Sequence, residues 1–328
     1  MPSPESTPKP SISVVIPVYN SAAILPSLID RLAQTLPEIA TEYEVLFVND
    51  GSRDNSWHEA QIAARAYPFV RAFNLMRNYG QHNALLCGIR MARHDVIVTM
   101  DDDLQHPPEE IHKLIDKLDE GYDVVYGTPQ HEQHGLWRDL ASQVTKIALQ
   151  SAMSVDVARN VSAFRAFRSL LREGFANYSS PYVSIDVLLT WTSTKFSNIA
   201  VQHNPRAAGV SNYTFWKLVN HALNMMTGYS TKPLQLASVI GFAFTLFGFG
   251  ILLFVLGRYL VTGDSVPGFP FLASIIAIFS GAQLFALGII GEYLARMHFR
   301  TMDRPTYAIR ATAVSLVETG EAIAVNDQ

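Results

Sequence analysis

The amino-acid sequence predicts an α/β fold with a doubly wound, mostly parallel sheet, followed by an interfacial helix and a two-helix transmembrane hairpin. Three observations support this prediction. Short apolar runs alternate with segments of helical spacing, roughly every 20–30 residues, which is typical of a parallel α/β sheet. Polar or acidic residues follow each apolar run. Two long stretches, 236–257 and 269–291, contain no charged residue.

The α/β domain is expected to span residues 11–210. Ser11–Asn20 opens it with a continuous apolar run, which is typical of a strand buried on both faces. Residues 1–10 contain four prolines and are interpreted as a disordered lead-in. Further strands are expected at 43–48, 70–75, 96–100, 124–127, 161–167 and 198–201. Helices are expected at 22–36, 54–66, 109–120 and 138–151, and another follows Gln81 and runs through Ala92. Residues 185–191 could form either a helix or a strand.

An acidic stretch follows the strand that ends near Met100. Side chains alternate along a strand, so Asp101 and Asp103 should point one way and Asp102 the other. Two carboxylates at the C-terminal end of a parallel strand could share a divalent cation with a phosphate. The alternative is an acidic loop that only caps the helix beginning near Pro107.

Polar residues also end the other strands, at Tyr19-Asn20, Asp50 and Arg77-Asn78. In a doubly wound sheet these ends converge on one edge. The sequence lacks a Gly-x-Gly-x-x-Gly motif and a P-loop, which argues against a dinucleotide fold and a P-loop enzyme. Its net charge of −4 argues against a nucleic-acid partner, and its single cysteine excludes an intrachain disulfide.

The last third of the chain is expected to meet a membrane. Residues 211–231 mix aromatic side chains with a lysine, as interfacial helices do, although an ordinary domain-edge helix is the alternative. The hairpin at 232–295 has spans at about 234–258 and 269–293, long enough to cross a bilayer. Lysine and arginine flank its outer ends, which places the domain and the tail, 296–328, in the cytoplasm. Residues from Ala311 on are expected to be mobile.

Four segments carry a resemblance to a known family. They are Ser-Val-Val-Ile-Pro-Val-Tyr-Asn, Val-Asn-Asp-Gly-Ser-x-Asp-Asn, Arg-Asn-Tyr-Gly-Gln-His and Asp-x-Asp-Leu-Gln-His-Pro-Pro-Glu. Their order and spacing resemble the inverting glycosyltransferases of family 2, within them the polyprenyl-phosphate sugar transferases, which include dolichol-phosphate mannose synthase and bacterial glucosyl and aminoarabinosyl relatives. The resemblance runs from about Ser11 to Arg304. It implies a GT-A fold, a nucleotide-diphosphate sugar donor, with UDP favoured over GDP, and a polyprenyl phosphate acceptor at the inner (cytoplasmic) membrane.

The resemblance also implies roles for particular residues. Asp101 and Asp103 match a motif that carries Mg²⁺ or Mn²⁺ on the diphosphate, and Gln105 matches a further polar ligand. Arg165 matches an arginine in the segment that receives the lipid phosphate, and Arg206 one that meets the phosphates. Pro17, Tyr19 and Asp50 fall where the family holds the nucleoside, and Asp50 is expected to contact the base. Arg77 and Ser162 are further residues expected in substrate binding, and Ser162 lies near Arg165 in the sequence.

The implied chemistry is consistent with these residues. A lipid monophosphate is already a nucleophilic anion, so transfer requires no strong general base. The metal would stabilise the departing diphosphate, and Arg165 and Arg206 would offset the repulsion between two anions. In-line displacement at the anomeric carbon then inverts its configuration. Asp101, Asp103, Arg165 and Arg206 are therefore the candidate catalytic residues.

The sequence departs from the family pattern at several positions. Asn20-Ser21 stands where relatives usually have Asn-Glu, and Asn212 stands where many have lysine. Asp102 replaces a small residue and is expected to face away from the metal. Two other functions remain open: a processive polysaccharide synthase, which usually carries Gln-x-x-Arg-Trp, and a membrane scaffold with a retired transferase domain. Oligomer formation through the hairpin and the 138–151 helix is also left open.

Overall fold

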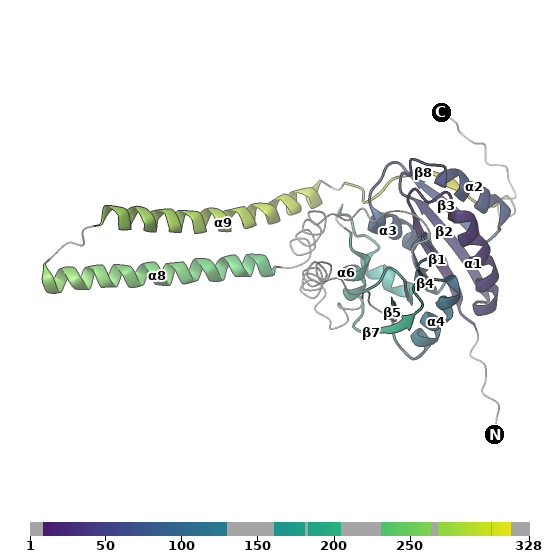
Figure 1. The fold of residues 1–328 in the computed structure, drawn as a ribbon, viewed down its shortest axis with the longest axis horizontal. Helices are drawn as coiled ribbons and strands as arrows, with labels where there is room; N and C mark the ends of the chain where they lie inside the picture. The colour runs from purple at the N-terminus through teal and green to yellow at the C-terminus, as the bar shows by residue number, and fades with distance from the viewer. Residues whose placement is uncertain are drawn as a thin grey trace, which may run out of the picture.

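The computed structural model describes residues 9–129, 161–180, 183–204, 231–263, 268–302 and 304–315. An α/β domain carries two long helices that project from one side of it (Figure 1). The predicted interfacial helix at 211–231 and amphipathic helix at 138–151 lie outside the described residues, apart from Thr231.

The domain is built on an eight-stranded sheet with the order β7-β5-β6-β4-β1-β2-β3-β8. The central strands β4, β1, β2 and β3 are parallel to one another. β6 is antiparallel to both β4 and β5, and β8 is antiparallel to β3. This mixed, mostly parallel sheet confirms the predicted fold class. The strands are β1 (Ser11–Val18), β2 (Glu42–Asn49), β3 (Val70–Leu75), β4 (Val96–Thr99), β5 (Val124–Pro129), β6 (Arg165–Arg168), β7 (Phe196–Val201) and β8 (Ile309–Ala313).

Apolar side chains cover both faces of this sheet. Val14 and Ile16 of β1 belong to one buried cluster and Val15 to the other, so the continuous apolar run of β1 is explained by burial on both sides. Gly88 allows close approach on the second face, because a Cβ there would overlap the side chain of Val15. The helices are α1 (Leu25–Ile39), α2 (Ser56–Ala66), α3 (Gln81–Met91), α4 (Ile111–Asp119) and α6 (Ile185–Thr190), with 3₁₀ turns η1 (Pro108–Glu110) and η3 (Ser169–Phe175).

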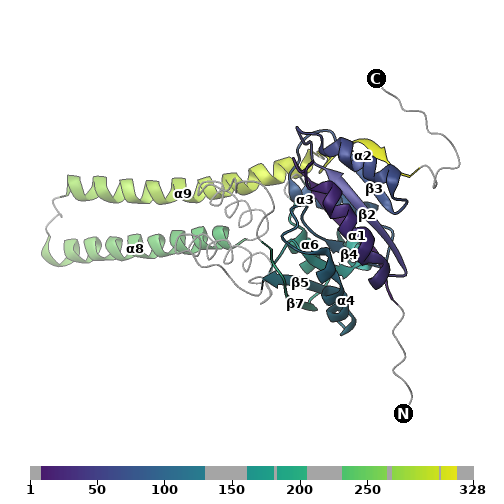
Figure 2. The ribbon, with the colours of Figure 1, turned by 45° about the vertical axis from the view of Figure 1, so that its right-hand side comes forward.

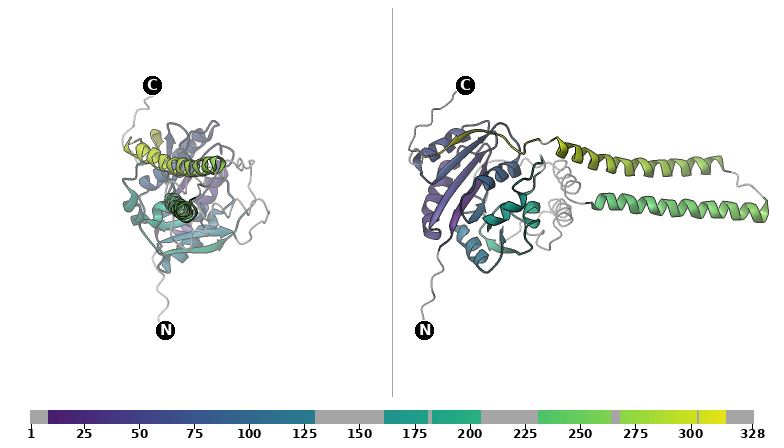
Figure 3. Two further views of the ribbon diagram at one scale, coloured as in Figure 1. Left: turned by 90° about the vertical axis from the view of Figure 1, so that its left-hand side faces the viewer. Right: turned by 180° about the vertical axis from the view of Figure 1, so that it is seen from behind.

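Two long helices, α8 (Lys232–Thr262) and α9 (Phe269–Thr301), follow the domain. Both contain a segment long and apolar enough to cross a membrane, Pro233–Val261 and Ile278–His298. The helices lie side by side, and the rings of Phe244 and Phe279 meet edge to face with centroids 5.7 Å apart (Figure 2). Figure 3 shows α8 nearly end on with α9 running obliquely past it in the left view, and both helices from behind in the right view. Their large apolar side chains, such as Phe242 and Leu260, point outward and are exposed, as lipid-facing side chains would be.

The segment after α9 returns to the domain, and residues 311–313 form part of β8, which corrects the expectation of mobility for them. The remainder of the predicted mobile tail, residues 316–328, lies outside the described residues. β8 pairs with the edge strand β3, with Ala313 opposite Ala72 and Thr312 opposite Phe73. The β3 edge would otherwise expose unpaired backbone groups, and β8 covers them. The five residues of β8, Ile-Arg-Ala-Thr-Ala, carry a weak sequence signal for a strand. Pairing with β3, and not the local pattern, therefore defines this strand.

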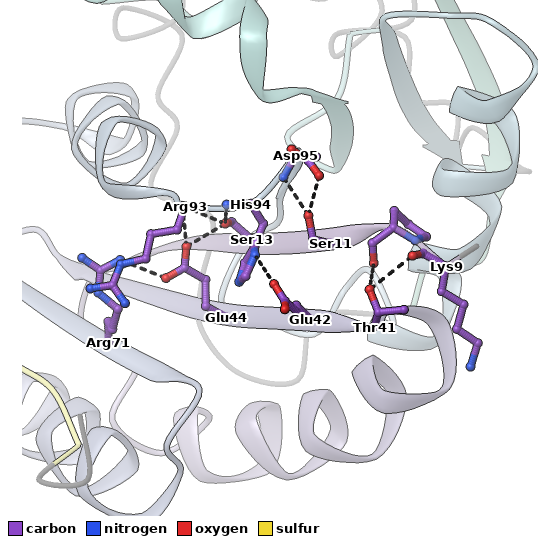
Figure 4. A network of polar contacts seen from close by, with 11 residues as sticks. Lys9, Ser11, Ser13, Thr41, Glu42, Glu44, Arg71, Arg93, His94 and Asp95 are labelled. Atoms are coloured by element: carbon purple, nitrogen blue, oxygen red, sulfur yellow. Dashed lines mark hydrogen bonds and ion pairs between the residues drawn. The ribbon is translucent and has the colours of Figure 1, made fainter. Parts of the chain in front are cut away.

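A buried polar network lies at the N-terminal ends of the parallel strands (Figure 4). Glu44 of β2 accepts hydrogen bonds from the Ser13 hydroxyl, 2.7 Å away, and from the Arg93 backbone N–H, also at 2.7 Å. Its other carboxylate oxygen lies 2.9 Å from Nη1 of Arg71. Arg71 also donates to the Met91 carbonyl at the end of α3. The network therefore joins β1, β2, β3 and the segment before β4 at the edge opposite the predicted site.

Candidate active site

Four predicted site residues follow the carboxyl ends of neighbouring parallel strands: Tyr19 after β1, Asp50 after β2, Arg77 after β3 and Asp101 after β4. In the views of Figures 1 and 2, α3 and α6 are the labelled helices of the domain nearest to the hairpin. α3 begins at this edge of the sheet, directly after the loop that follows β3. The structure therefore brings the four predicted strand ends together at one edge of the sheet, and ligand binding there stays a prediction.

The three consecutive aspartates lie in a turn and not in a strand, because β4 ends at Thr99. Strand alternation therefore does not set their directions. Asp101 accepts a hydrogen bond from the Gln81 side-chain amide at 2.6 Å, and Asp103 accepts one from the Gln105 backbone N–H at 3.1 Å. Leu104, with φ of +57°, turns the chain between Asp103 and Gln105.

Asp102 is directed to the loop after β1, where the Tyr19 backbone N–H donates to its carboxylate at 3.2 Å. Burial raises the pKa of Asp102, while hydrogen bonds from Ser21 and Tyr19 lower it and the charge of Asp103 raises it further. Asp102 thus joins the β4 loop to the β1 loop, whereas Asp101 contacts α3. The expectation that Asp102 takes no part in metal binding stays a prediction.

The chemistry of Asp101, Asp103 and Gln105 fits a shared metal site. All three offer oxygen atoms, which Mg²⁺ and Mn²⁺ prefer. Within the described ranges, His, Cys, Asp and Glu form no group of three that could hold a metal ion without help. A diphosphate would have to complete the coordination, which suits a metal that arrives with its nucleotide.

Asp50 holds the loop between β3 and α3. Its two carboxylate oxygens accept hydrogen bonds from the backbone N–H groups of Tyr79, at 2.7 Å, and Gly80, at 2.8 Å. Burial raises the pKa of Asp50, and these two hydrogen bonds oppose that shift. Gly51 has φ of +66°, and a Cβ there would overlap the backbone of Asn78. Asp50 thereby fixes the start of α3, and its expected contact with a base stays a prediction.

The other residues expected in donor binding differ in accessibility. Tyr19 is 45% exposed after β1, while Pro17 is buried inside that strand beside Val48 of β2. The Arg77 guanidinium carbon lies 4.6 Å from the centre of the Tyr79 ring, a cation–π contact. Tyr19 and Arg77 are therefore accessible at this edge of the sheet, whereas Pro17 is not, and the donor-binding roles of all three stay predictions.

Arg165 lies at the start of β6, opposite Thr99 of β4. It is only 1% exposed, its Nε donates to the Thr99 hydroxyl at 3.0 Å, and its guanidinium forms an ion pair with Asp186 of α6. The Tyr126 hydroxyl lies 3.1 Å from the same Asp186 oxygen. Burial lowers the pKa of Arg165, but Asp186, Tyr126 and Asp101 raise it above its ordinary value. The predicted site thus contains a buried ion pair, and its contact with a lipid phosphate stays a prediction.

Sequence reasoning missed Asp186. It stands in the apolar segment Ile185–Leu189, where a carboxylate is seldom buried unless it is paired. That isolated charge was the available signal, but the arginine that pairs with it lies 21 positions away. No motif links the two.

The chain leading to Arg206 passes beside residues 101–105, which we call the aspartate loop. The Asn204 backbone N–H donates to the Gln105 carbonyl at 2.8 Å, and Nε2 of His203 lies 3.4 Å from the Gln105 side-chain amide. Arg206 itself lies outside the described residues. Ser162 is half-buried and accepts a hydrogen bond from the Phe164 N–H at 3.2 Å.

His106 closes the far end of the aspartate loop. It is 8% exposed, and its ring stacks on Phe164 and meets His203 edge to face. Burial, followed by the charge of His203, lowers the pKa of His106 to about 4, against a weaker opposite effect of Asp103. This ring is therefore neutral at neutral pH and packs the loop against β6.

Comparison with known proteins assigns this arrangement to a family. Residues 13–175 match glycosyl transferase family 2. The chain is 36% identical over 312 residues to the undecaprenyl-phosphate 4-deoxy-4-formamido-L-arabinose transferase of Pseudomonas aeruginosa (strain LESB58), which covers 93% of this chain and 92% of that protein. It is 35% identical over 316 residues to the protein of that name from Shewanella sediminis (strain HAW-EB3), with 95% of each chain covered.

A solved structure agrees on the fold. The glucosyl-3-phosphoglycerate synthase of Mycobacterium tuberculosis, in a complex with Mn²⁺, UDP and glucosyl-3-phosphoglycerate, superposes with a TM-score of 0.51 at 17% identity. The match covers 66% of this chain and 78% of that one, and it supports a GT-A-like domain. The matches to these two relatives cover 93% and 95% of this chain, so they extend beyond the α/β domain into the two apolar helices. The chain belongs to glycosyltransferase family 2.

Proposed function

We propose that this chain transfers a sugar from a nucleotide-diphosphate sugar to a polyprenyl phosphate at a membrane surface. One observation carries the proposal: a single chain joins the oxygen-rich loop Asp101–Gln105, at the carboxyl ends of the parallel strands, to two long apolar helices. A water-soluble donor and a lipid acceptor require these two parts. The names of the relatives, undecaprenyl-phosphate sugar transferases, agree with this pairing.

In the proposed mechanism, Asp101, Asp103 and Gln105 would hold Mg²⁺ or Mn²⁺ beside the diphosphate. The chemistry that the metal would supply there is Lewis-acid stabilisation of the charge on the departing nucleotide. Asp50 and Arg77 would shape the loop beside the nucleoside. We favour UDP over GDP as the donor nucleotide because the relatives are bacterial undecaprenyl-phosphate sugar transferases.

The acceptor phosphate needs no base, since it is already an anion that can attack the anomeric carbon in line and invert it. Arg206 approaches from the segment after His203, whose side chain lies beside Gln105. Arg165 lies below the loop, in the ion pair with Asp186. Arginine's planar fork suits phosphate, so both residues would offset the repulsion between acceptor and donor.

The proposed topology has both termini and the catalytic domain in the cytoplasm, with α8 and α9 as a hairpin in the inner membrane. Single cysteines introduced into a Cys87→Ala background would test it. We expect a charged maleimide to label Val261→Cys, at the turn side of α8, in intact cells. Thr312→Cys, on β8, should be labelled only after the cells are permeabilised. The reverse pattern would overturn this topology.

The test of the reaction is incubation of membranes that contain the protein with polyprenyl phosphate and a panel of UDP- and GDP-sugars. The sugar named in the relatives, 4-deoxy-4-formamido-L-arabinose, heads the panel. We expect the mass of the lipid to rise by one sugar residue with a UDP-linked donor. Products with several sugars would indicate a processive synthase, and no product with any donor would favour a retired scaffold.

A further inference from the structure

The segment that follows α9 contacts a loop of the candidate nucleotide site. Residues 76–80, which we call the β3–α3 loop, lie between the end of β3 and the start of α3. The Met76 backbone N–H donates to the Ala308 carbonyl at 2.9 Å, and a guanidinium nitrogen of Arg310 donates to the Met76 carbonyl at 3.2 Å. Both polar groups of the Met76 backbone are therefore held by the chain that returns from the two apolar helices.

A change of register in β8 places Arg310 opposite this loop. Ala311 pairs with Asn74, but the next pair along the strands joins Ile309 to Leu75. Arg310 is the extra residue between these two pairs, which makes it a β-bulge at the edge of the sheet. A bulge redirects a single side chain and is common beside functional sites. The side chain of Arg310 is exposed, so its guanidinium does not serve to fill the core.

The backbone on both sides of Arg310 is fixed to the domain. Tyr307 and Ile309 pack against the apolar cluster on the second face of the sheet. The guanidinium carbon of Arg90, on α3, lies 5.8 Å from the centre of the Tyr307 ring. Beyond the bulge, β8 continues in regular antiparallel pairing with β3. Arg310 therefore extends from a well-supported part of the chain to the exposed loop.

The other end of the β3–α3 loop is held by different contacts. Asp50 accepts hydrogen bonds from the N–H groups of Tyr79, at 2.7 Å, and Gly80, at 2.8 Å. Arg77 lies between the two attachments, with its guanidinium carbon 4.6 Å from the centre of the Tyr79 ring. A loop held at one end only would have to be ordered when a ligand binds, and that ordering costs affinity.

We propose that Arg310 is a positioning residue for the donor nucleotide: it holds the Met76 end of the β3–α3 loop and keeps Arg77 oriented before the nucleotide binds. This inference rests on the proposed function, in which Arg77 shapes the loop beside the nucleoside. Arg310 acts through the loop and not by touching the substrate. The chain that leaves the apolar helices thereby helps to organise the donor site.

Isothermal titration of UDP, with Mn²⁺ present, into the full-length protein in detergent measures this role. Arg310→Met keeps the apolar stem and removes the hydrogen-bond donor, and we expect it to raise the dissociation constant of UDP about fivefold. Arg310→Lys should stay within about twofold of the wild type, because the contact is a single hydrogen bond and not a bidentate one. Thr312→Ala is the matched control, since Thr312 is also exposed on β8 but pairs in regular register with Phe73. It should leave the constant unchanged.

Two further measurements separate positioning from a merely structural role. Hydrogen exchange of the ligand-free protein should become faster at the amides of residues 76–80 in Arg310→Met, while the melting temperature stays nearly unchanged, since surface substitutions affect stability little. In turnover, the same variant should raise KM for the sugar donor about fivefold. Its kcat and its KM for polyprenyl phosphate should change less than about twofold.

Wild-type UDP affinity in Arg310→Met would overturn the inference alone, as would an equal loss in Thr312→Ala, which would assign the effect to strand docking. Weaker UDP binding without faster exchange in the β3–α3 loop would also overturn it, because Arg310 would then contact the nucleotide itself. If the wild type bound neither UDP nor GDP, the proposed donor site would be overturned and this inference with it.

Discussion

Two buried arginine–carboxylate pairs occupy opposite edges of the same sheet. At the N-terminal edge, Arg71 pairs with Glu44, whose oxygens are also bound by Ser13 and by the Arg93 N–H (Figure 4). At the C-terminal edge, Arg165 pairs with Asp186 beneath the aspartate loop. Both arginines and both carboxylates are largely shielded from water.

The difference lies in what surrounds each pair. Glu44 is enclosed by donors from strands and from the end of a helix, so its pair ties structural elements together. Arg165 lies opposite Thr99 of β4, two residues before three consecutive aspartates, and such a concentration of negative charge suits a divalent cation. The same kind of ion pair therefore joins structural elements at one edge and lies close in sequence pairing to the candidate metal-binding loop at the other.

The largest expected effect comes from the aspartate loop. Replacing Asp103 with alanine removes a proposed metal ligand, and we expect sugar transfer to polyprenyl phosphate to fall at least about 100-fold. The exposed Asp116→Ala on α4 is the matched control and should retain activity. Near-normal, metal-dependent turnover by Asp103→Ala would contradict the assignment of this edge as the catalytic one.

The opposite edge should respond in stability and not in chemistry. Glu44→Gln leaves Arg71 without its counter-ion, and breaking a buried pair costs about 3–5 kcal/mol of unfolding free energy. Thermal melting of the purified protein would measure this loss, and transfer per folded molecule should be unchanged. A variant with unaltered melting would show that the network in Figure 4 is not a stabilising one.

The sequence predicted some parts of the fold and of the candidate site better than others. The alternation of apolar and helical segments predicted the parallel strands correctly, since burial on both faces imposes it. β6 and β8 pair antiparallel through contacts distant in sequence, which local patterns do not encode. Strand ends predicted that Tyr19, Asp50, Arg77 and Asp101 would share one edge of the sheet, as they do in the structure, and their functional roles stay predictions. Strand alternation was the wrong guide to Asp101–Asp103, because β4 ends before them.

A smaller effect concerns the contact between the returning C-terminal segment and α3. Burial raises the pKa of the Cys87 thiol to about 12, partly offset by a hydrogen bond with Tyr307. Because only the thiolate reacts, Cys87 should resist iodoacetamide at pH 8 and at pH 10, where exposed thiols are ionised. Tyr307→Ala removes the side chain that is hydrogen-bonded to the Cys87 thiol, and we expect alkylation of Cys87 to become measurably faster. Mass spectrometry of the labelled protein would follow it, and rapid labelling of the wild type at pH 8 would contradict this packing.

The most direct test of the central claim is a crystal structure of the protein with UDP and Mn²⁺, in which anomalous scattering locates the metal. The account predicts one manganese peak about 2.1–2.3 Å from carboxylate oxygen of Asp101 or Asp103 and from the diphosphate. The Arg165–Asp186 ion pair should be retained in that complex. A manganese ion bound away from this loop, or UDP bound with its diphosphate pointing away from it, would contradict the account.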